Sequence, residues 1–359
     1  MTPHLALQVV LDEVIVAVMK GAGRDPQAGH LARVGEEVRE AARMYDERGW
    51  LDDPLSYHRT PPPLEAPMVA VESSLGIRYE HLSWESDYEP WPDEPGRDRW
   101  QALDANRTAH AYVLRHRGGP RPWVVCVHGF GTGRPLLDFS PFRVKRLFRD
   151  LGLNVLLPVL PGHGPRRGDR PGGHWMTTLE MLDAVFAMAQ ATWDIRRALS
   201  WIRAQGETAV GIYGISLGGC AAALQVAVVP GYEAVVAAVP VSDLPALFAF
   251  HSPSRFRREA MQLGVLGDPA AAVFRVVSPL AMRPQVARDR RFVVAGRGDR
   301  MSTAEQAHRL WLHWDRPTIA WYDGNHVGYS RSGTAEEFVV EAMAGSGLRV
   351  EPPAAPSMA

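Results

Sequence analysis

The chain has 359 residues, enough for one large domain or two ordinary ones with a deep hydrophobic core. Its 39 Lys and Arg residues nearly balance its 40 Asp and Glu residues, so it lacks the positive excess of a dedicated nucleic-acid-binding protein. Hydrophobic residues make up 46% and charged residues 22%, which is typical of a folded globular protein and unlike a disordered one. The two cysteines, Cys126 and Cys220, provide no disulfide framework or cysteine-based zinc site, and they fit a reducing, cytoplasmic location.

The first apolar segment, residues 5–19, is interrupted by Asp12 and Glu13, and no Lys or Arg precedes it. It is also shorter than the roughly 20 residues of a membrane-spanning helix, so we expect neither a signal peptide nor a transmembrane segment. The pattern favours an amphipathic helix that packs on the body of the protein, with a weak peripheral membrane contact as the alternative. Residues 30–49 have apolar side chains at three- and four-residue steps, which predicts a second helix.

Prolines at 61, 62 and 63 indicate a linker, because proline lacks a backbone N–H and restricts the residue before it. We therefore expect an N-terminal helical extension and linker over residues 1–75, a main domain over 76–350 and a disordered tail over 351–359. Short apolar strands alternate with helices in the main domain, which predicts an α/β fold with a mostly parallel sheet covered on both faces. The segment 242–290 interrupts this alternation and is predicted to be a helical insertion. The predicted strands are 77–84, 109–114, 123–128, 155–160, 209–213, 234–240, 292–295 and 318–321, and the predicted helices are 142–151, 178–204, 220–228, 302–314 and 335–344.

The sequence Gly-Ile-Ser-Leu-Gly at 214–218 directly follows a predicted strand and precedes a helix rich in small residues. Its two glycines are typical of a sharp strand-to-helix turn that exposes the serine between them, although an ordinary glycine turn is the alternative. A serine hydroxyl is a poor nucleophile at neutral pH, so Ser216 needs a base and a group that orients the base.

Asp299 and His326 follow the last two predicted strands. The carboxyl ends of parallel strands meet at one edge of a sheet, so Ser216, Asp299 and His326 are expected to converge on one site. Alternatives stay open for each: Asp299 as the cap of the next helix, His326 as a surface loop residue, and Asp243, after the preceding strand, as the acid.

The chain resembles the α/β-hydrolase superfamily in the order of its Ser, Asp and His residues. It also has two turns typical of that superfamily, His-Gly-Phe-Gly at 128–131 and Leu-Pro-Gly-His-Gly at 160–164. The resemblance covers about residues 77–347, and it implies an α/β-hydrolase fold with a helical cap insertion and an N-terminal helical extension. It implies that Ser216 is the nucleophile, His326 the base and Asp299 the acid. It also implies that the backbone N–H groups of Phe130 and Leu217 form the oxyanion hole.

The function expected from this resemblance is a serine hydrolase that cleaves a small-molecule carboxylic ester through an acyl-enzyme, without a cofactor or metal. The apolar insertion favours a medium or long acyl group, and the alternative is that these side chains form the insertion's own core. An amidase or peptidase with the same three residues, and a non-catalytic binding protein of the same fold, are the rival functions. The oligomeric state and the role of the N-terminal extension stay open, with a homo-oligomer among the options.

Overall fold

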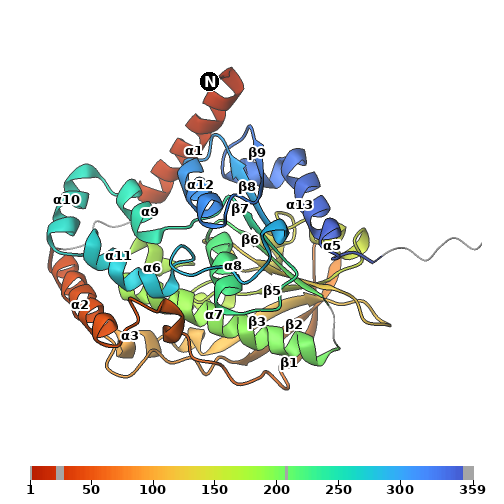
Figure 1. Ribbon diagram of the computed structural model, residues 1–359, viewed down its shortest axis with the longest axis horizontal. Coiled ribbons are helices and arrows are strands. Elements are labelled where there is room, and N and C mark those ends of the chain that lie inside the picture. Colours follow the sequence, from red (N-terminus) through yellow and green to blue (C-terminus); the bar gives the residue numbers. More distant parts are fainter. Residues whose placement is uncertain (1, 22–27, 207–208, 351–359) are drawn as a thin grey trace, which may run out of the picture.

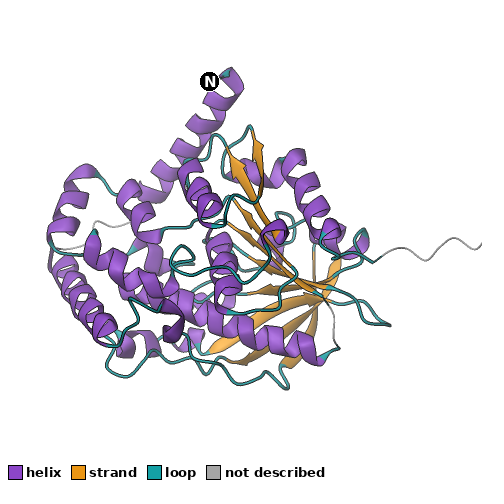
Figure 2. Cartoon of the chain, in the orientation of Figure 1, coloured by secondary structure: helices purple, strands orange, loops and turns teal. Residues whose placement is uncertain are grey.

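The computed structural model describes residues 2–21, 28–206 and 209–350, in which nine strands form one twisted sheet (Figure 2). The strand order is β1-β2-β3-β5-β4-β6-β7-β8-β9. Pairing is antiparallel from β1 to β5 and parallel from β5 onward, as predicted for an α/β-hydrolase fold. The strands are β1 (Met68–Ser74), β2 (Ile77–Glu85), β3 (Thr108–Leu114), β4 (Trp123–Val127), β5 (Asn154–Pro158), β6 (Val210–Ile215), β7 (Ala234–Ala238), β8 (Arg291–Gly296) and β9 (Thr318–Tyr322).

Helices cover both faces of the sheet (Figure 1). Alternate residues of a strand point to opposite faces. Val125 and Val127 of β4 therefore pack with α7 (Met181–Ala204) and α8 (Leu217–Val228), whereas Val124 and Cys126 pack with α5 (Val144–Arg149) and α13 (Gly333–Gly345). The helices are α1 (Pro3–Gly21), α2 (Ala28–Glu47), α3 (Arg97–Gln101), α4 (Pro135–Asp138), α5 (Val144–Arg149), α6 (His174–Thr177), α7 (Met181–Ala204), α8 (Leu217–Val228), α9 (Leu244–His251), α10 (Ser254–Gln262), α11 (Asp268–Phe274), α12 (Ala304–His313) and α13 (Gly333–Gly345).

Two differences from the predicted elements have clear causes. Residues 68–74, placed in the linker, form the edge strand β1, whose residues are almost all exposed and which is held by backbone pairing with β2. The predicted helix 142–151 is shorter, because Arg143 adopts φ 49° and its guanidinium donates to the carbonyls of Ser330 and Ser332. The proposed tail 351–359 lies outside the described residues.

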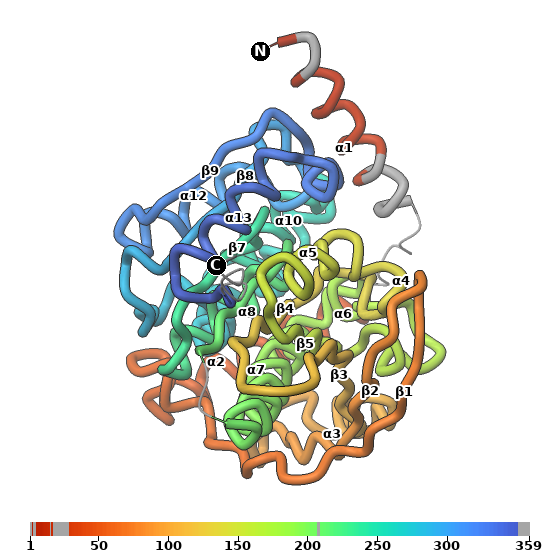
Figure 3. The backbone as a smooth tube through the Cα atoms, turned by 90° about the vertical axis from the view of Figure 1, so that its right-hand side faces the viewer, coloured from red at the N-terminus to blue at the C-terminus, as the bar shows by residue number. Residues whose placement is uncertain are grey.

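The two N-terminal helices contact different parts of the domain. Helix α2 packs against α11 and α7 (Figure 1), while α1 extends along the outer side of the loops that follow β8 and β9 (Figure 3). Asp12 and Val16 of α1 are buried, but its opposite side exposes Leu7, Val10, Leu11 and Val14. Among the residues that the structure describes, none of the helices combines the length and apolar character needed to cross a membrane.

Candidate active site

Ser216 lies in a sharp turn between β6 and α8. Its φ of 59° and ψ of −119° are unusual for a residue with a side chain and indicate a strained backbone. Its N–H donates to Ala238 O on the neighbouring strand (2.9 Å), and its carbonyl accepts from Gly219 N (2.9 Å). These bonds hold the serine at the carboxyl end of β6.

Two glycines of this turn are required by close backbone contacts. A Cβ atom on Gly214 would lie 2.0 Å from Gly218 O, and a Cβ atom on Gly218 would lie 1.8 Å from Val127 O. Neither position has room for a larger residue, so the pattern around Ser216 follows from the geometry of the turn.

Ser216, His326 and Asp299 form a continuous chain of hydrogen bonds. Ser216 Oγ lies 2.9 Å from His326 Nε2, and His326 Nδ1 lies 2.7 Å from Asp299 Oδ2. The acid and the imidazole come from the loops after β8 and β9, which are parallel neighbours. Their side chains are only 2% and 9% exposed, so water screens the pair weakly. The structure thus brings together three residues that the sequence predicted to meet at this edge of the sheet.

The pKa values of this pair are coupled. Burial alone would lower the pKa of His326, but the Asp299 carboxylate, which accepts a hydrogen bond from the imidazole, raises it above its usual value. Burial would raise the pKa of Asp299, but the charge of His326 and hydrogen bonds from His326 and Ser302 lower it. Each group therefore favours the charged form of the other, which suits an imidazole that accepts a proton.

Asp299 is also anchored by its own loop. Its Oδ1 accepts from the N–H groups of Met301 and Ser302, both at 2.9 Å, and the Ser302 hydroxyl lies 2.9 Å from Oδ2. The acid and turn-capping interpretations are therefore compatible, because each uses a different carboxylate oxygen.

Asp243, the rival for the acid, has other partners. Its Oδ1 accepts from Ala246 N (2.9 Å) as the N-cap of α9, and its Oδ2 accepts from Arg309 (3.0 Å). These contacts give Asp243 a structural role at the start of the insertion.

The loop after β4, which carries Phe130, lies against the turn of Ser216. A Cβ atom on the preceding Gly129 would lie 3.3 Å from Ser216 Cβ, so the two segments are in contact. Leu217 is the first residue of α8, and the first N–H groups of a helix have no acceptor inside that helix. The N–H groups of Phe130 and Leu217 are the candidate donors for an oxyanion, and their role stays a prediction.

His128 connects this loop to the loop after β5. Leu160 N donates to His128 Nε2 (3.0 Å), and His128 Nδ1 lies 2.8 Å from Gly129 O. Burial lowers the pKa of His128 to about 4, so the imidazole is neutral at pH 7 and can donate through one nitrogen while accepting through the other. This side chain fixes the shape of the loop that carries Phe130.

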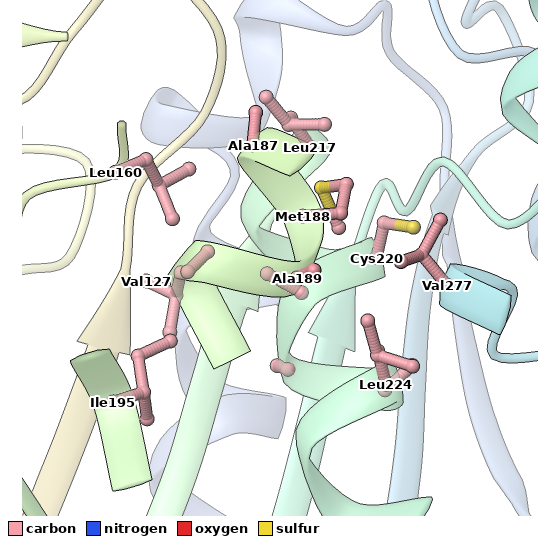
Figure 4. Close-up of a cluster of buried hydrophobic side chains, with 14 of the residues drawn as sticks. Val127, Leu160, Ala187, Met188, Ala189, Ile195, Leu217, Cys220, Leu224 and Val277 are labelled. Atoms are coloured by element: carbon pink, nitrogen blue, oxygen red, sulfur yellow. The ribbon is translucent and has the colours of Figure 1, made fainter. Parts of the chain in front are cut away.

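Behind the turn lies a cluster of buried hydrophobic side chains (Figure 4). Cys220 and Leu224 of α8 pack there with Met188 of α7 and Val277. Burial raises the pKa of the Cys220 thiol to about 12, so this cysteine is an apolar packing residue despite its proximity to Ser216. Across the described ranges, no group of three His, Cys, Asp or Glu side chains is arranged to hold a metal ion.

Most apolar side chains of segment 242–290 are buried in the main core. They share a cluster with residues of α2 and α7 rather than standing apart. Phe250 and Met261, by contrast, are 47% and 55% exposed. This burial favours the interpretation that the insertion uses its apolar residues for packing. The buried members are Leu244, Leu247, Phe248, Leu266, Val273 and Phe274.

Two further residues at the site were not predicted from the sequence. Ser302 contacts Asp299 through both its hydroxyl and its N–H. Asp12, from the distant helix α1, accepts a hydrogen bond from the backbone N–H of His326 (2.9 Å). A charged residue within an otherwise apolar segment was the signal for Asp12, because such a side chain is rarely buried without a specific partner.

With this fold and this site, the chain belongs to the alpha/beta hydrolase family, whose model matches residues 124–355. Its sequence is 39% identical over 351 residues to two uncharacterized proteins of Mycobacterium tuberculosis, MT2702 of strain CDC 1551 / Oshkosh and Rv2627c of strain H37Rv. The match covers 97% of this chain and 84% of each relative.

Similar solved structures have the same fold at low sequence identity. Acetyl xylan esterase 1 from Thermoanaerobacterium sp. JW/SL YS485 superposes with a TM-score of 0.56 at 14% identity, over 87% of this chain and 98% of that one. An acetyl xylan esterase from Paenibacillus sp. R4 gives a TM-score of 0.55 at 15% identity, over 83% and 99%. Acylaminoacyl peptidase from Pyrococcus horikoshii gives 0.50 at 13% identity, over 80% and 42%. At these identities the likeness concerns the fold alone.

Proposed function

We propose that the protein is a serine hydrolase that cleaves a carboxylic ester, with Ser216 as nucleophile, His326 as base and Asp299 as the orienting acid. The observation that carries this proposal is the hydrogen-bond chain from Asp299 Oδ2 through His326 to Ser216 Oγ. It ends on a serine held in a strained turn. A protein that used the fold only for binding would not need this arrangement.

The reaction follows from the direction of the hydrogen bonds. His326 donates through Nδ1 to Asp299, which leaves the Nε2 lone pair facing the serine hydroxyl. As Oγ attacks the ester carbonyl carbon, Nε2 takes its proton, and the C–O bond to the alcohol then breaks as Nε2 returns the proton to the leaving oxygen. Water cleaves the acyl-enzyme by the same route, which releases the carboxylic acid and regenerates Ser216.

The developing negative charge would be met by the N–H groups of Phe130 and Leu217. Gly129 is in contact with Ser216, and Leu217 directly follows it. Each donor aimed at an oxyanion contributes about 2.7–4 kcal/mol to the lowering of the barrier.

We further propose a short acyl group for the substrate. The apolar residues of the insertion that favoured a medium or long acyl group are mostly buried in the core. Two of the similar structures are acetyl xylan esterases, which is consistent with a small acyl group at this fold. With a series of 4-nitrophenyl esters from acetate to decanoate, we expect the highest kcat/KM at the short end.

Ser216→Ala should lower kcat on these esters by on the order of 10⁴–10⁶-fold without unfolding the protein, because it removes the nucleophile. Reaction with a fluorophosphonate probe and mapping by mass spectrometry should place the label on Ser216. Ser56→Ala, at an exposed position before β1, is the matched control and should leave the kcat unchanged.

Three results would argue against the proposal. A Ser216→Ala variant with parental turnover would exclude this serine as the nucleophile. Good amide turnover with negligible ester turnover would favour the peptidase alternative. A folded parent that neither labels nor turns over any ester would favour a binding function.

A further inference from the structure

A buried carboxylate of the N-terminal helix touches both catalytic loops. Asp12 Oδ2 accepts a hydrogen bond from His326 N and another from Arg300 N, both at 2.9 Å. These are the N–H of the proposed base itself and the N–H that follows the proposed acid, Asp299. Asp12 is separated from Arg300 by 288 residues and from His326 by 314 residues along the chain, and α1 lies beside these loops (Figure 3).

The side chains of the two loops meet in the hydrogen bond between Asp299 and His326 and in a contact of Ser302 Oγ with His326 Nδ1 (3.2 Å). Among the described residues, the direct backbone bonds between the loops lie at their bases. Gly298 N donates to Gly324 O (2.9 Å), and Arg297 N donates to Tyr322 O (3.0 Å). Beyond these bonds, toward Ser216, the same oxygen of Asp12 joins the loops where they carry the acid and the imidazole.

The burial of Asp12 is unfavourable in itself. Its residue is 0% exposed, and within the described part of the chain its Oδ1 has no hydrogen-bond partner. Desolvation therefore raises the pKa of Asp12, only partly offset by the two backbone N–H groups. An apolar residue would bury this helix face at a lower cost, so the carboxylate is best explained by its contacts with the two loops.

We infer that Asp12 is a positioning residue whose carboxylate holds the loop of Asp299 and the loop of His326 in the relative position that the hydrogen-bond chain requires. The inference rests on the proposed function, and it makes α1 part of the hydrolytic site. A displacement of about 1 Å at His326 can lower a rate by about 10²-fold, so a fixed backbone at this residue has a direct effect on turnover.

The negative charge of Asp12 also affects the imidazole of His326. The ionisable groups that face His326 are Asp299 from the loop after β8 and Asp12 from α1, and both raise the pKa of the imidazole. Asp12 itself faces Asp299, His326 and the phenol of Tyr322, whereas the guanidinium of Arg300 pairs with Glu13. Loss of the Asp12 charge should therefore lower the pKa of His326.

The test compares Asp12→Ala, Asp12→Asn and Glu13→Gln in the full-length protein. Asp12→Ala removes the acceptor and should lower kcat about 10- to 100-fold with little change in KM. Asp12→Asn keeps an acceptor without the charge, so it should recover most of the kcat while the acid limb of the kcat/KM profile moves to lower pH. Glu13→Gln alters the adjacent, exposed position on the same helix and should match the parent.

Histidine NMR titration, with the His326 resonance assigned from a His326→Gln variant, gives a readout that needs no turnover. A lower His326 pKa in folded Asp12→Asn than in Glu13→Gln supports the inference. If Asp12→Ala unfolds, Asp12→Asn decides: a folded variant with parental kcat and an unshifted His326 pKa overturns it. Failure of the proposed function would show instead in the parent, as absent labelling at Ser216.

Discussion

At the residue scale, the choice between Asp299 and Asp243 as the acid has a direct test. In Asp299→Asn, an amide NH₂ would face His326 Nδ1 and favour the tautomer with hydrogen on Nε2, which cannot accept the serine proton. We expect kcat to fall by on the order of 10⁴-fold, the size of the effect that the same substitution has in a known Ser-His-Asp enzyme. Asp243→Asn keeps the acceptor that caps α9 and loses an ion pair with the half-exposed Arg309, so its kcat should stay near that of the parent.

The result would contradict our assignment if the Asp243 variant lost turnover while the Asp299 variant kept it. Steady-state kinetics on one 4-nitrophenyl ester and circular dichroism of both variants are sufficient, because the two substitutions are chemically identical.

Residues such as Ser216, Asp299 and His326 could be located from the sequence because each directly follows a recognisable strand. Topology then brings the ends of parallel strands together. Asp12 and Ser302 could not be assigned in this way. Asp12 reaches the site through the docking of a helix from the opposite end of the chain, and no local pattern specifies where that helix binds.

At the element scale, the N-terminal helix α2 holds the insertion through a close backbone contact. A Cβ atom on Gly35 would lie 1.9 Å from Leu263 O, the same carbonyl that accepts from the Arg39 guanidinium. Gly35→Ala should therefore force α2 and the end of α10 apart and lower the free energy of unfolding by about 1–3 kcal/mol. Urea unfolding measures the change.

Gly29 is the matched control, since nothing lies within 4 Å of a Cβ atom added there on the same helix. Gly29→Ala should be neutral or stabilising by up to about 1 kcal/mol, because alanine is the better helix former. Equal urea midpoints for the two variants would show that a methyl group at position 35 does not clash with the insertion, against our prediction.

Elements with a strong hydrophobic period were predictable, and those defined by tertiary contact were not. The long helix α7 and the buried strands follow from their apolar patterns. Strand β1 does not, because nearly all of its side chains are exposed and its stability comes from backbone bonds to β2. The shortened helix α5 likewise depends on a long-range bond, from Arg143 to the carbonyl of Ser330.

At the scale of the whole molecule, buried neutral histidines couple folding to pH. His163 is 0% exposed, its Nδ1 lies 2.9 Å from Pro161 O, and burial lowers its pKa to about 3. The unfolded chain binds a proton on this residue below its usual pKa of 6.5, whereas the folded chain does not until about pH 3. The contribution of His163 to stability is therefore complete above pH 6.5 and is lost as the pH falls toward 3.

The loss of this contribution can be measured by comparing the parent with a His163 variant, because the two proteins share all their other titrating groups. Between pH 7 and pH 5, the parent should lose up to about 2 kcal/mol more stability than His163→Asn, in which an amide can replace the Nδ1 donor and no proton is taken up on unfolding. Urea unfolding of both proteins at pH 7 and at pH 5 measures how much more stability the parent loses. His308→Asn, at an exposed position on α12, should follow the parent. If His163→Asn also followed the parent, the neutral imidazole would not contribute to the acid sensitivity of the fold.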